Sequence, residues 1–157
     1  MIEQIHTYFT LEMIYLWLNL GVLPFWLVLV FFPYSKICKI FTISIFPILI
    51  LGLTYCYVIF IIFQNGYDFL NNFKLYLNLY ELLSLFSDSS FLILFWIHFL
   101  AINLFCGGWI VNDYQKFGVS KILMIFPLII TYFIGPLGIL IYWLIRIYYA
   151  KRISIYD

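Results

Sequence analysis

The chain alternates long apolar runs with short polar breaks, and this pattern predicts four membrane-spanning helices. The apolar runs cover residues 13–33, 40–63, 91–111 and 122–149. A helix rises about 1.5 Å per residue, so the first run reaches roughly 31 Å and matches a hydrocarbon core of about 30 Å. The predicted fold is therefore all-α: a polytopic membrane bundle of four transmembrane helices, forming a single membrane domain over residues 1–157.

The fourth run differs from the others because it is longer than one straight crossing requires. Gly135-Pro136, followed by Gly138, offers a break in its middle. A kinked or partly unwound helix exposes backbone polar groups, which the membrane tolerates only against protein or a wet cavity. Gly107-Gly108 in the third run and the glycines of the fourth are expected to allow close helix approach and a bend.

Residues 67–86 lack a long apolar run and show a different periodicity. Polar residues recur at helical spacing while leucine and phenylalanine fill the opposite face, which predicts an amphipathic helix in the membrane interface between the second and third spans. A solvated linker with chance periodicity is the alternative. Asp88 and its neighbouring serines are expected to cap the third span. The polar positions of the stripe are Asn71, Lys74, Asn78, Glu81, Ser84 and Asp88.

The composition requires lipid as solvent. The chain is 66% hydrophobic and 10% charged, against about 45–50% and about 25% in soluble domains. A chain of this size buries only about 70% of its surface, so a soluble core could not hold the excess. The net charge of +1 and the absence of Lys/Arg runs argue against nucleic acid as a partner.

The distribution of positive charge does not decide the orientation of four spans. With the N-terminus outside, the inner loops hold Lys36, Lys39, Lys116 and Lys121. The opposite orientation places Lys74, Arg146, Lys151 and Arg152 inside, with the last three marking the exit of the fourth span. Each orientation places four positive charges inside, so the positive-inside rule favours neither orientation.

No metal or cofactor motif is present. Cys38, Cys56 and Cys106 are an odd, widely spaced set, which indicates neither a disulfide framework nor a zinc site. His6 and His98 have no neighbouring carboxylate cluster, and the glycine pairs lack the strand–turn–helix context of a phosphate-binding loop. We therefore expect no metal and no cofactor.

The third run carries the polar residues that matter most. His98 and Asn103 lie inside it and Asp113 follows its end; such residues are functional-site candidates because they are costly in a membrane. At about 100° per residue, two helix faces result and predict two different contacts. One face holds His98, Ala101, Phe105, Trp109 and Asn112, and the other holds Trp96, Asn103 and Gly107.

Several short motifs occur in a fixed order along the chain. They are Leu23-Pro24-Phe25-Trp26, Pro33, Leu83/Leu85-Phe86, Trp96-Ile97-His98, Leu104-Phe105, Asn112-Asp113 and Gly135-Pro136-Leu137-Gly138. Their order and spacing resemble the abscisic-acid-deficient-four-like family of small four-helix membrane proteins, and the resemblance is densest from Trp96 to Gly138. In plants, members of that family are required to make neoxanthin from violaxanthin, while bacterial members mostly have no assigned role.

The resemblance implies a protein of a bacterial inner membrane or of a plastid or other organelle membrane. Its surroundings are then membrane lipid, and its partner a carotenoid or other isoprenoid. Three positions depart from the family pattern: Asn103 stands where relatives commonly have Asp, Gly108 where they have Arg, and Lys121 where they have His. These departures reduce the ionic cluster that the resemblance implies to His98 and Asp113.

If the plant reaction applies, an epoxide opens to an allene and a tertiary alcohol, which needs an acid and a base but no redox cofactor. The hypothesis is a cofactor-independent carotenoid epoxide isomerase-like activity, with His98 as the acid/base group and Asp113 as its partner. The alternative is that His98 bonds the backbone or a tyrosine hydroxyl of a neighbouring helix.

Two non-enzymatic functions stay open beside this hypothesis. One is a pigment-binding protein that holds a carotenoid or other isoprenoid in an apolar cleft, and the other is a structural subunit that assembles with other membrane protein subunits. The candidate ligand-binding residues are Trp96, Asn103, Phe105, Trp109, Asn112, Tyr132 and Tyr142.

Overall fold

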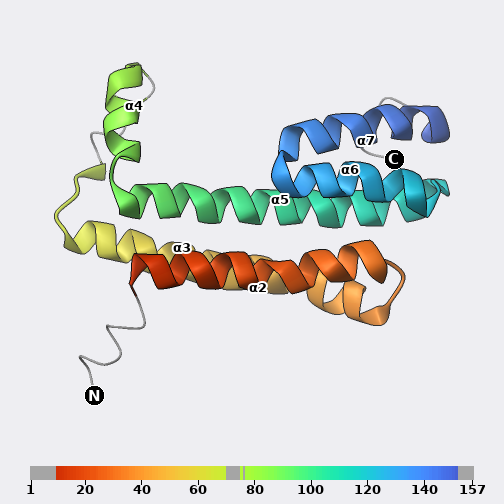
Figure 1. The fold of residues 1–157 in the computed structure, drawn as a ribbon, viewed down its shortest axis with the longest axis horizontal. Helices are drawn as coiled ribbons and strands as arrows, with labels where there is room; N and C mark the ends of the chain where they lie inside the picture. Colours follow the sequence, from red (N-terminus) through yellow and green to blue (C-terminus); the bar gives the residue numbers. More distant parts are fainter. Residues whose placement is uncertain (1–9, 70–74, 76, 152–157) are drawn as a thin grey trace. The chain divides into compact units, whose positions relative to one another are not determined.

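The computed structural model describes residues 10–69, 75 and 77–151, and in this part of the chain the fold is all-α, as predicted (Figure 1). The chain forms two compact units. Unit 1 comprises Met1–Gly21 and Leu49–Leu100, and unit 2 comprises Val22–Ile48 and Ala101–Asp157. The elements are α2 (Leu11–Phe31), the π-helical turn η1 (Cys38–Thr42), α3 (Phe46–Gln64), α4 (Leu79–Phe86), α5 (Ser89–Phe117), α6 (Lys121–Phe133) and α7 (Gly135–Ala150).

Among the described residues, three helical segments are long and apolar enough to cross a membrane. They are Leu11–Phe31, Cys38–Gln64 and Ser89–Phe117, of 21, 27 and 29 residues. They coincide with the first three predicted spans, and large apolar side chains such as Leu27, Phe60 and Phe105 are exposed on them. An exposed apolar surface of this extent is stable against lipid, so these helices indicate an integral membrane protein.

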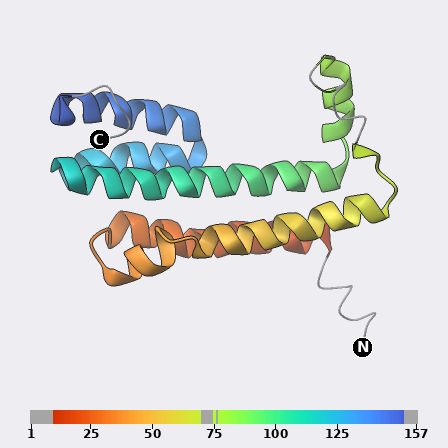
Figure 2. The same cartoon turned by 180° about the vertical axis from the view of Figure 1, so that it is seen from behind.

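The predicted fourth crossing over 122–149 is not confirmed. The structure divides this range into α6 and α7, which are joined at one end and lie side by side (Figures 1 and 2). Ile134 leaves the helical region with φ −140° and ψ 78° and ends α6. Pro136 then occupies the first turn of α7, where its missing N–H costs nothing. The predicted break at Gly135-Pro136 is present, but the chain reverses there instead of continuing as a kinked rod.

The amphipathic helix predicted for residues 67–86 is shorter in the structure. Within the described part of this range, only Leu79–Phe86 is α-helical, as α4. Tyr67 and Asp68 are not helical, and residues 70–74 and 76 lie outside the described residues. Asn78 is extended, with φ −141° and ψ 117°, and its side chain accepts a hydrogen bond from the Tyr80 backbone N–H. This N-cap begins a new helix, which a uniform periodicity does not reveal. The location of α4 in the membrane interface stays a prediction.

The ends of α5 follow from local sequence. Asp88 accepts hydrogen bonds from the backbone N–H groups of Ser90 and Phe91 at 2.8 and 3.3 Å, which confirms the predicted cap. Gly118 stops the helix with φ 64°, a conformation that favours glycine. The Ser120 side chain then caps α6 by accepting from the Leu123 N–H.

Glycines bring the helices of unit 2 close together, as predicted. A Cβ at Gly107 would lie 2.8 Å from Trp26 Cη2, and a Cβ at Gly135 would overlap the Asn103 side chain. At Gly138, a Cβ would overlap Thr131. Helices of membrane proteins commonly pack through such small residues, so these positions fix the packing of unit 2.

Candidate functional site

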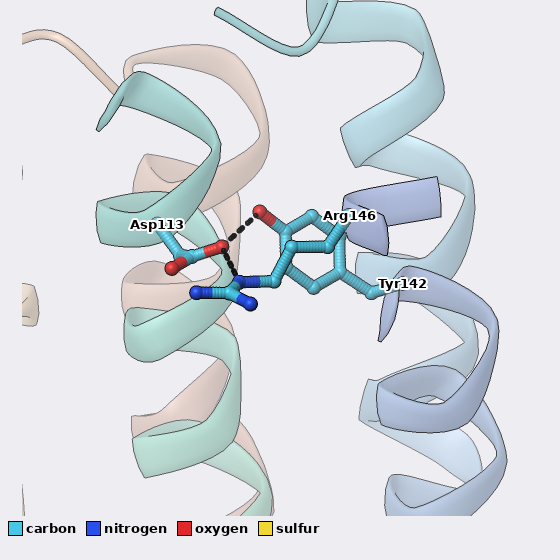
Figure 3. Close-up of polar contacts among 3 residues, drawn as sticks. All are labelled: Asp113, Tyr142 and Arg146. Carbon is cyan, nitrogen blue, oxygen red and sulfur yellow. Dashed lines mark hydrogen bonds and ion pairs between the residues drawn. The ribbon is translucent and has the colours of Figure 1, made fainter. Parts of the chain in front are cut away.

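Unit 2 contains a buried polar cluster formed by Asp113, Tyr142 and Arg146 (Figure 3). Asp113 comes from α5, and the other two lie one turn apart on α7, where an i, i+4 spacing places them on one face. Oδ2 of Asp113 accepts a hydrogen bond from the Tyr142 hydroxyl at 2.9 Å and another from Arg146 Nε at 2.8 Å. The cluster therefore joins α5 to α7.

The three side chains of this cluster are buried. Arg146 is 1% exposed, Asp113 5% and Tyr142 is fully buried. Arg146 Cζ also lies 4.8 Å from the centre of the Phe117 ring, a cation–π distance. Buried charges persist only when they are paired. Because one carboxylate oxygen already accepts two donors, Asp113 is held as the counter-ion of Arg146, an arrangement suited to fixing helices.

A groove lies next to this cluster within unit 2. It runs between one face of α5 and the segment from the end of η1 to the start of α3, with a volume of about 220 Å³. Its walls are mostly apolar, with polar groups at Thr42, Ser44 and Asn112. The lining residues are Thr42, Ile43, Ser44, Ile48, Leu104, Phe105, Gly108, Trp109 and Asn112.

Thr42 is the notable polar group of the groove. It is 4% exposed, and its hydroxyl has no hydrogen-bond partner among the described residues. A buried hydroxyl without a partner costs about 1–3 kcal/mol. A ligand atom that reached this hydroxyl from the groove and formed a hydrogen bond with it would recover that cost.

Trp109 connects the groove with the buried cluster. Its side chain lines the groove, and its ring packs edge-on against Tyr142 with centroids 5.6 Å apart and planes at 90°. Since Tyr142 is fixed by Asp113, the cluster holds one wall of the groove in place.

The predicted site residues fall into four groups. Phe105, Trp109 and Asn112, assigned to one helix face from their spacing, line the groove together. Asp113 and Tyr142 belong to the buried cluster.

Asn103 and Tyr132 make a different contact. Asn103 Nδ2 donates to the Tyr132 carbonyl at 3.5 Å, and the Tyr132 ring packs edge-on against Trp26 with centroids 5.3 Å apart. These two residues fasten the end of α6 to α5, and neither lines the groove.

Trp96 and His98 belong to unit 1. Trp96 Nε1 donates to Asn19 Oδ1 at 3.2 Å, and its ring lies 5.9 Å from that of Tyr15. The His98 side chain is exposed. His98 and Asp113 are fifteen positions apart on α5, about 22 Å of axial rise, and Asp113 takes its hydrogen-bond donors from α7. The structure therefore does not bring the proposed acid/base pair together.

Two functional candidates were missed from the sequence. The sequence predicts Arg146 at the exit of a span, whereas the structure buries it. The signal was its position inside an apolar run, four residues after Tyr142, since a charge there usually has a partner in the protein. Thr42 carried no comparable signal, because its burial depends on the π-helical turn that ends with it.

The sequence was compared with protein families, curated proteins and solved structures. No curated protein and no solved structure matches the chain at a significant level. The sequence model of the ABA DEFICIENT 4-like family matches residues 13–142, which includes every residue of the groove and two members of the buried cluster, Asp113 and Tyr142. This confirms the resemblance drawn from the motifs. The chain is a member of the ABA DEFICIENT 4-like family.

Proposed function

We propose that this protein binds the oxygenated end of a carotenoid or related isoprenoid in the groove of unit 2. The observation that carries the proposal is the buried Thr42 hydroxyl, which has no partner among the described residues, at a groove walled by Phe105 and Trp109. Apolar walls with a few polar groups are typical of small-molecule sites. Family membership supports this choice of ligand, because plant relatives are required for a step between two xanthophylls.

The size of the groove favours binding of one end of a long molecule. Its volume of about 220 Å³ is below the roughly 300–1,000 Å³ of pockets that enclose a drug-sized ligand. A carotenoid would place one end ring against Trp109 and extend its polyene along the exposed apolar surface. The hydroxyl or epoxide oxygen of that ring would reach Thr42, Ser44 or Asn112.

Gly108 gives the groove its opening. A Cβ at this position would lie 3.9 Å from Ile43 Cα, an ordinary contact, so alanine fits and a longer side chain enters the groove. The family resemblance places arginine at this position in many relatives. Glycine here leaves room for a ligand and makes the wall apolar.

The test is binding of violaxanthin to the purified protein in nanodiscs. Binding is measured by the quenching of tryptophan fluorescence and by the amount of pigment that stays with the protein. Gly108→Leu should abolish binding, whereas Gly52→Leu, the same change at a helix position with open space around it, should leave it unchanged. Equal binding by both variants, or none by the wild type, would reject the groove as the site.

Thr42→Val sharpens the test because it preserves the size of the side chain. Loss of one hydrogen bond of about 1 kcal/mol should weaken binding of violaxanthin roughly fivefold. Binding of β-carotene, which has no oxygen, should not change. The same variant should stabilise the ligand-free protein, because it removes a buried hydroxyl without a partner.

Conversion of violaxanthin is the second candidate, favoured by family membership. In that case the bound pigment would turn over, with His98 as the acid/base group to test. Asp113 is not its partner, because it lies about 22 Å away along α5 and is paired with Arg146. Turnover that is lost in His98→Ala, with binding retained, supports the enzyme. Bound pigment without turnover supports a binding protein, and obligate co-purification with other chains supports a subunit of a membrane complex.

A further inference from the structure

The turn between α6 and α7 lies against the middle of α5. At the turn, Gly135 packs so closely on Asn103 that a Cβ would overlap its side chain, and the Asn103 amide donates to the Tyr132 carbonyl at 3.5 Å. Asn103 is the central residue of α5, with fourteen residues on either side. The turn therefore reaches halfway along a helix that is long enough to cross a membrane.

Neither helix of the pair is long enough to cross alone. α6 has 13 residues and α7 has 16, which correspond to about 20 and 24 Å, against a hydrocarbon core of about 30 Å. Near its end, α7 is again level with the end of α5, because Arg146 contacts Asp113 and lies over the ring of Phe117, the last residue of α5. The pair thus leaves the end of α5 and returns to it.

The turn meets the requirement for irregular backbone at membrane depth, which must be buried in protein. Gly135 is buried. The Ile134 N–H donates to the Ile130 carbonyl at 2.7 Å and the Gly138 N–H to the Ile134 carbonyl at 3.1 Å. With the Asn103 amide on the Tyr132 carbonyl, protein atoms supply hydrogen bonds to the backbone around the break.

Five lysines gather at the end of unit 2 where this pair begins and ends. Lys121 Nζ donates to the Phe31 carbonyl at 3.1 Å and Gln115 Nε2 to the Pro33 carbonyl at 2.9 Å, so the ends of α2 and α5 meet there. The one acidic residue in the described part of unit 2 is Asp113, which is buried and paired with Arg146. We call the exposed residues Lys36, Lys39, Lys116, Lys121 and Lys151 the lysine face.

We propose that α6 and α7 form a re-entrant hairpin that enters and leaves the membrane at the lysine face, and that this face binds anionic phospholipid headgroups. Clusters of four or more basic residues next to a membrane segment attract anionic lipid. With a hairpin, Lys151 lies on the same side of the membrane as Lys36, Lys39, Lys116 and Lys121. The buried Arg146 is not counted as a positive charge on either side. The equal division of charge expected for four spans is removed, and the positive-inside rule places the lysine face on the cytoplasmic side or its organellar equivalent.

Sidedness in proteoliposomes tests the hairpin with the native lysines. Proteoliposomes are first separated by the orientation of the protein in the membrane. A membrane-impermeant amine-reactive ester is then added from outside, and the labelling of each lysine is measured by mass spectrometry. Lys116 and Lys151 should label from the same side, and Ser89→Lys, at the opposite end of α5, from the other. Labelling of Lys151 together with position 89 would show that the α6–α7 segment crosses the membrane and would overturn the proposal.

Lipid selectivity tests the surface. In nanodiscs of phosphatidylcholine with a minor fraction of phosphatidylglycerol, the wild type should enrich phosphatidylglycerol in its lipid shell at least twofold. Changing all five lysines to glutamine should abolish this enrichment, while changing them to arginine should preserve it. Equal enrichment in the glutamine and arginine variants, or none in the wild type, would refute binding of anionic headgroups by this face.

Discussion

In unit 2, the contact that we expect to be most costly to break by a single substitution is the ion pair of Asp113 and Arg146. Arg146→Met keeps an unbranched apolar stem but removes the guanidinium group that faces Asp113. With the carboxylate 5% exposed, the change leaves a buried charge without its counter-ion, which costs about 3–5 kcal/mol. Tyr142→Phe removes only the second donor to the same oxygen and should cost about 1.5–3 kcal/mol, the range for bonds to charged groups.

The free energy of unfolding in mixed micelles, titrated with sodium dodecyl sulfate, measures these costs. The variant Asp113→Leu/Arg146→Met removes both charges and should recover most of the loss, because replacing a buried pair by apolar residues is often close to neutral. Lys39→Met removes an exposed positive charge and should change stability by no more than about 0.5 kcal/mol. The prediction is wrong if Arg146→Met costs no more stability than Lys39→Met. It is also wrong if the losses of stability in Asp113→Leu and in Arg146→Met add up in the double variant.

Three further substitutions test the packing of unit 2 by the same unfolding titration. Gly107→Val should destabilise by about 1–3 kcal/mol through overpacking, since a Cβ already comes within 2.8 Å of Trp26, whereas Gly52→Val, with open space, should not. Gly118→Ala should cost about 1–2 kcal/mol because φ is 64° there; no loss would mean that the turn relaxes. Asn103→Leu should cost about 1 kcal/mol through the unpaired Tyr132 carbonyl, and an unchanged stability would contradict its role at the turn.

The spans that could be predicted are those for which length and apolarity suffice. Three segments carry more apolar surface than a soluble core could hold: α2, α5 and the segment Cys38–Gln64. The apolar runs of the sequence therefore locate them within a few residues. The reversal after Phe133 could not be predicted in this way. A kinked crossing and a hairpin share the same Gly135-Pro136 break, and the contacts of Asn103 and Arg146 with distant residues decide between them.

The candidate site shows the same division. Helical periodicity correctly grouped Phe105, Trp109 and Asn112 on one face, because positions three and four apart on a helix are neighbours whatever surrounds them. Asp113 was chosen as a polar residue at the end of a span, but its partners lie about thirty residues further along the chain. Periodicity within one helix carries no information about such a contact.

The central claim is that the groove of unit 2 receives the oxygenated end of an isoprenoid. Photocrosslinking tests it most directly, with a carotenoid analogue that carries a diazirine on its end ring, in nanodiscs, and with adducts located by mass spectrometry. We predict adducts within residues 42–48 and 104–112, the two segments that contain the lining residues of the groove. These adducts should be lost in Gly108→Leu but not in Gly52→Leu. Adducts spread over the exposed apolar surface, or concentrated in unit 1, would contradict the claim.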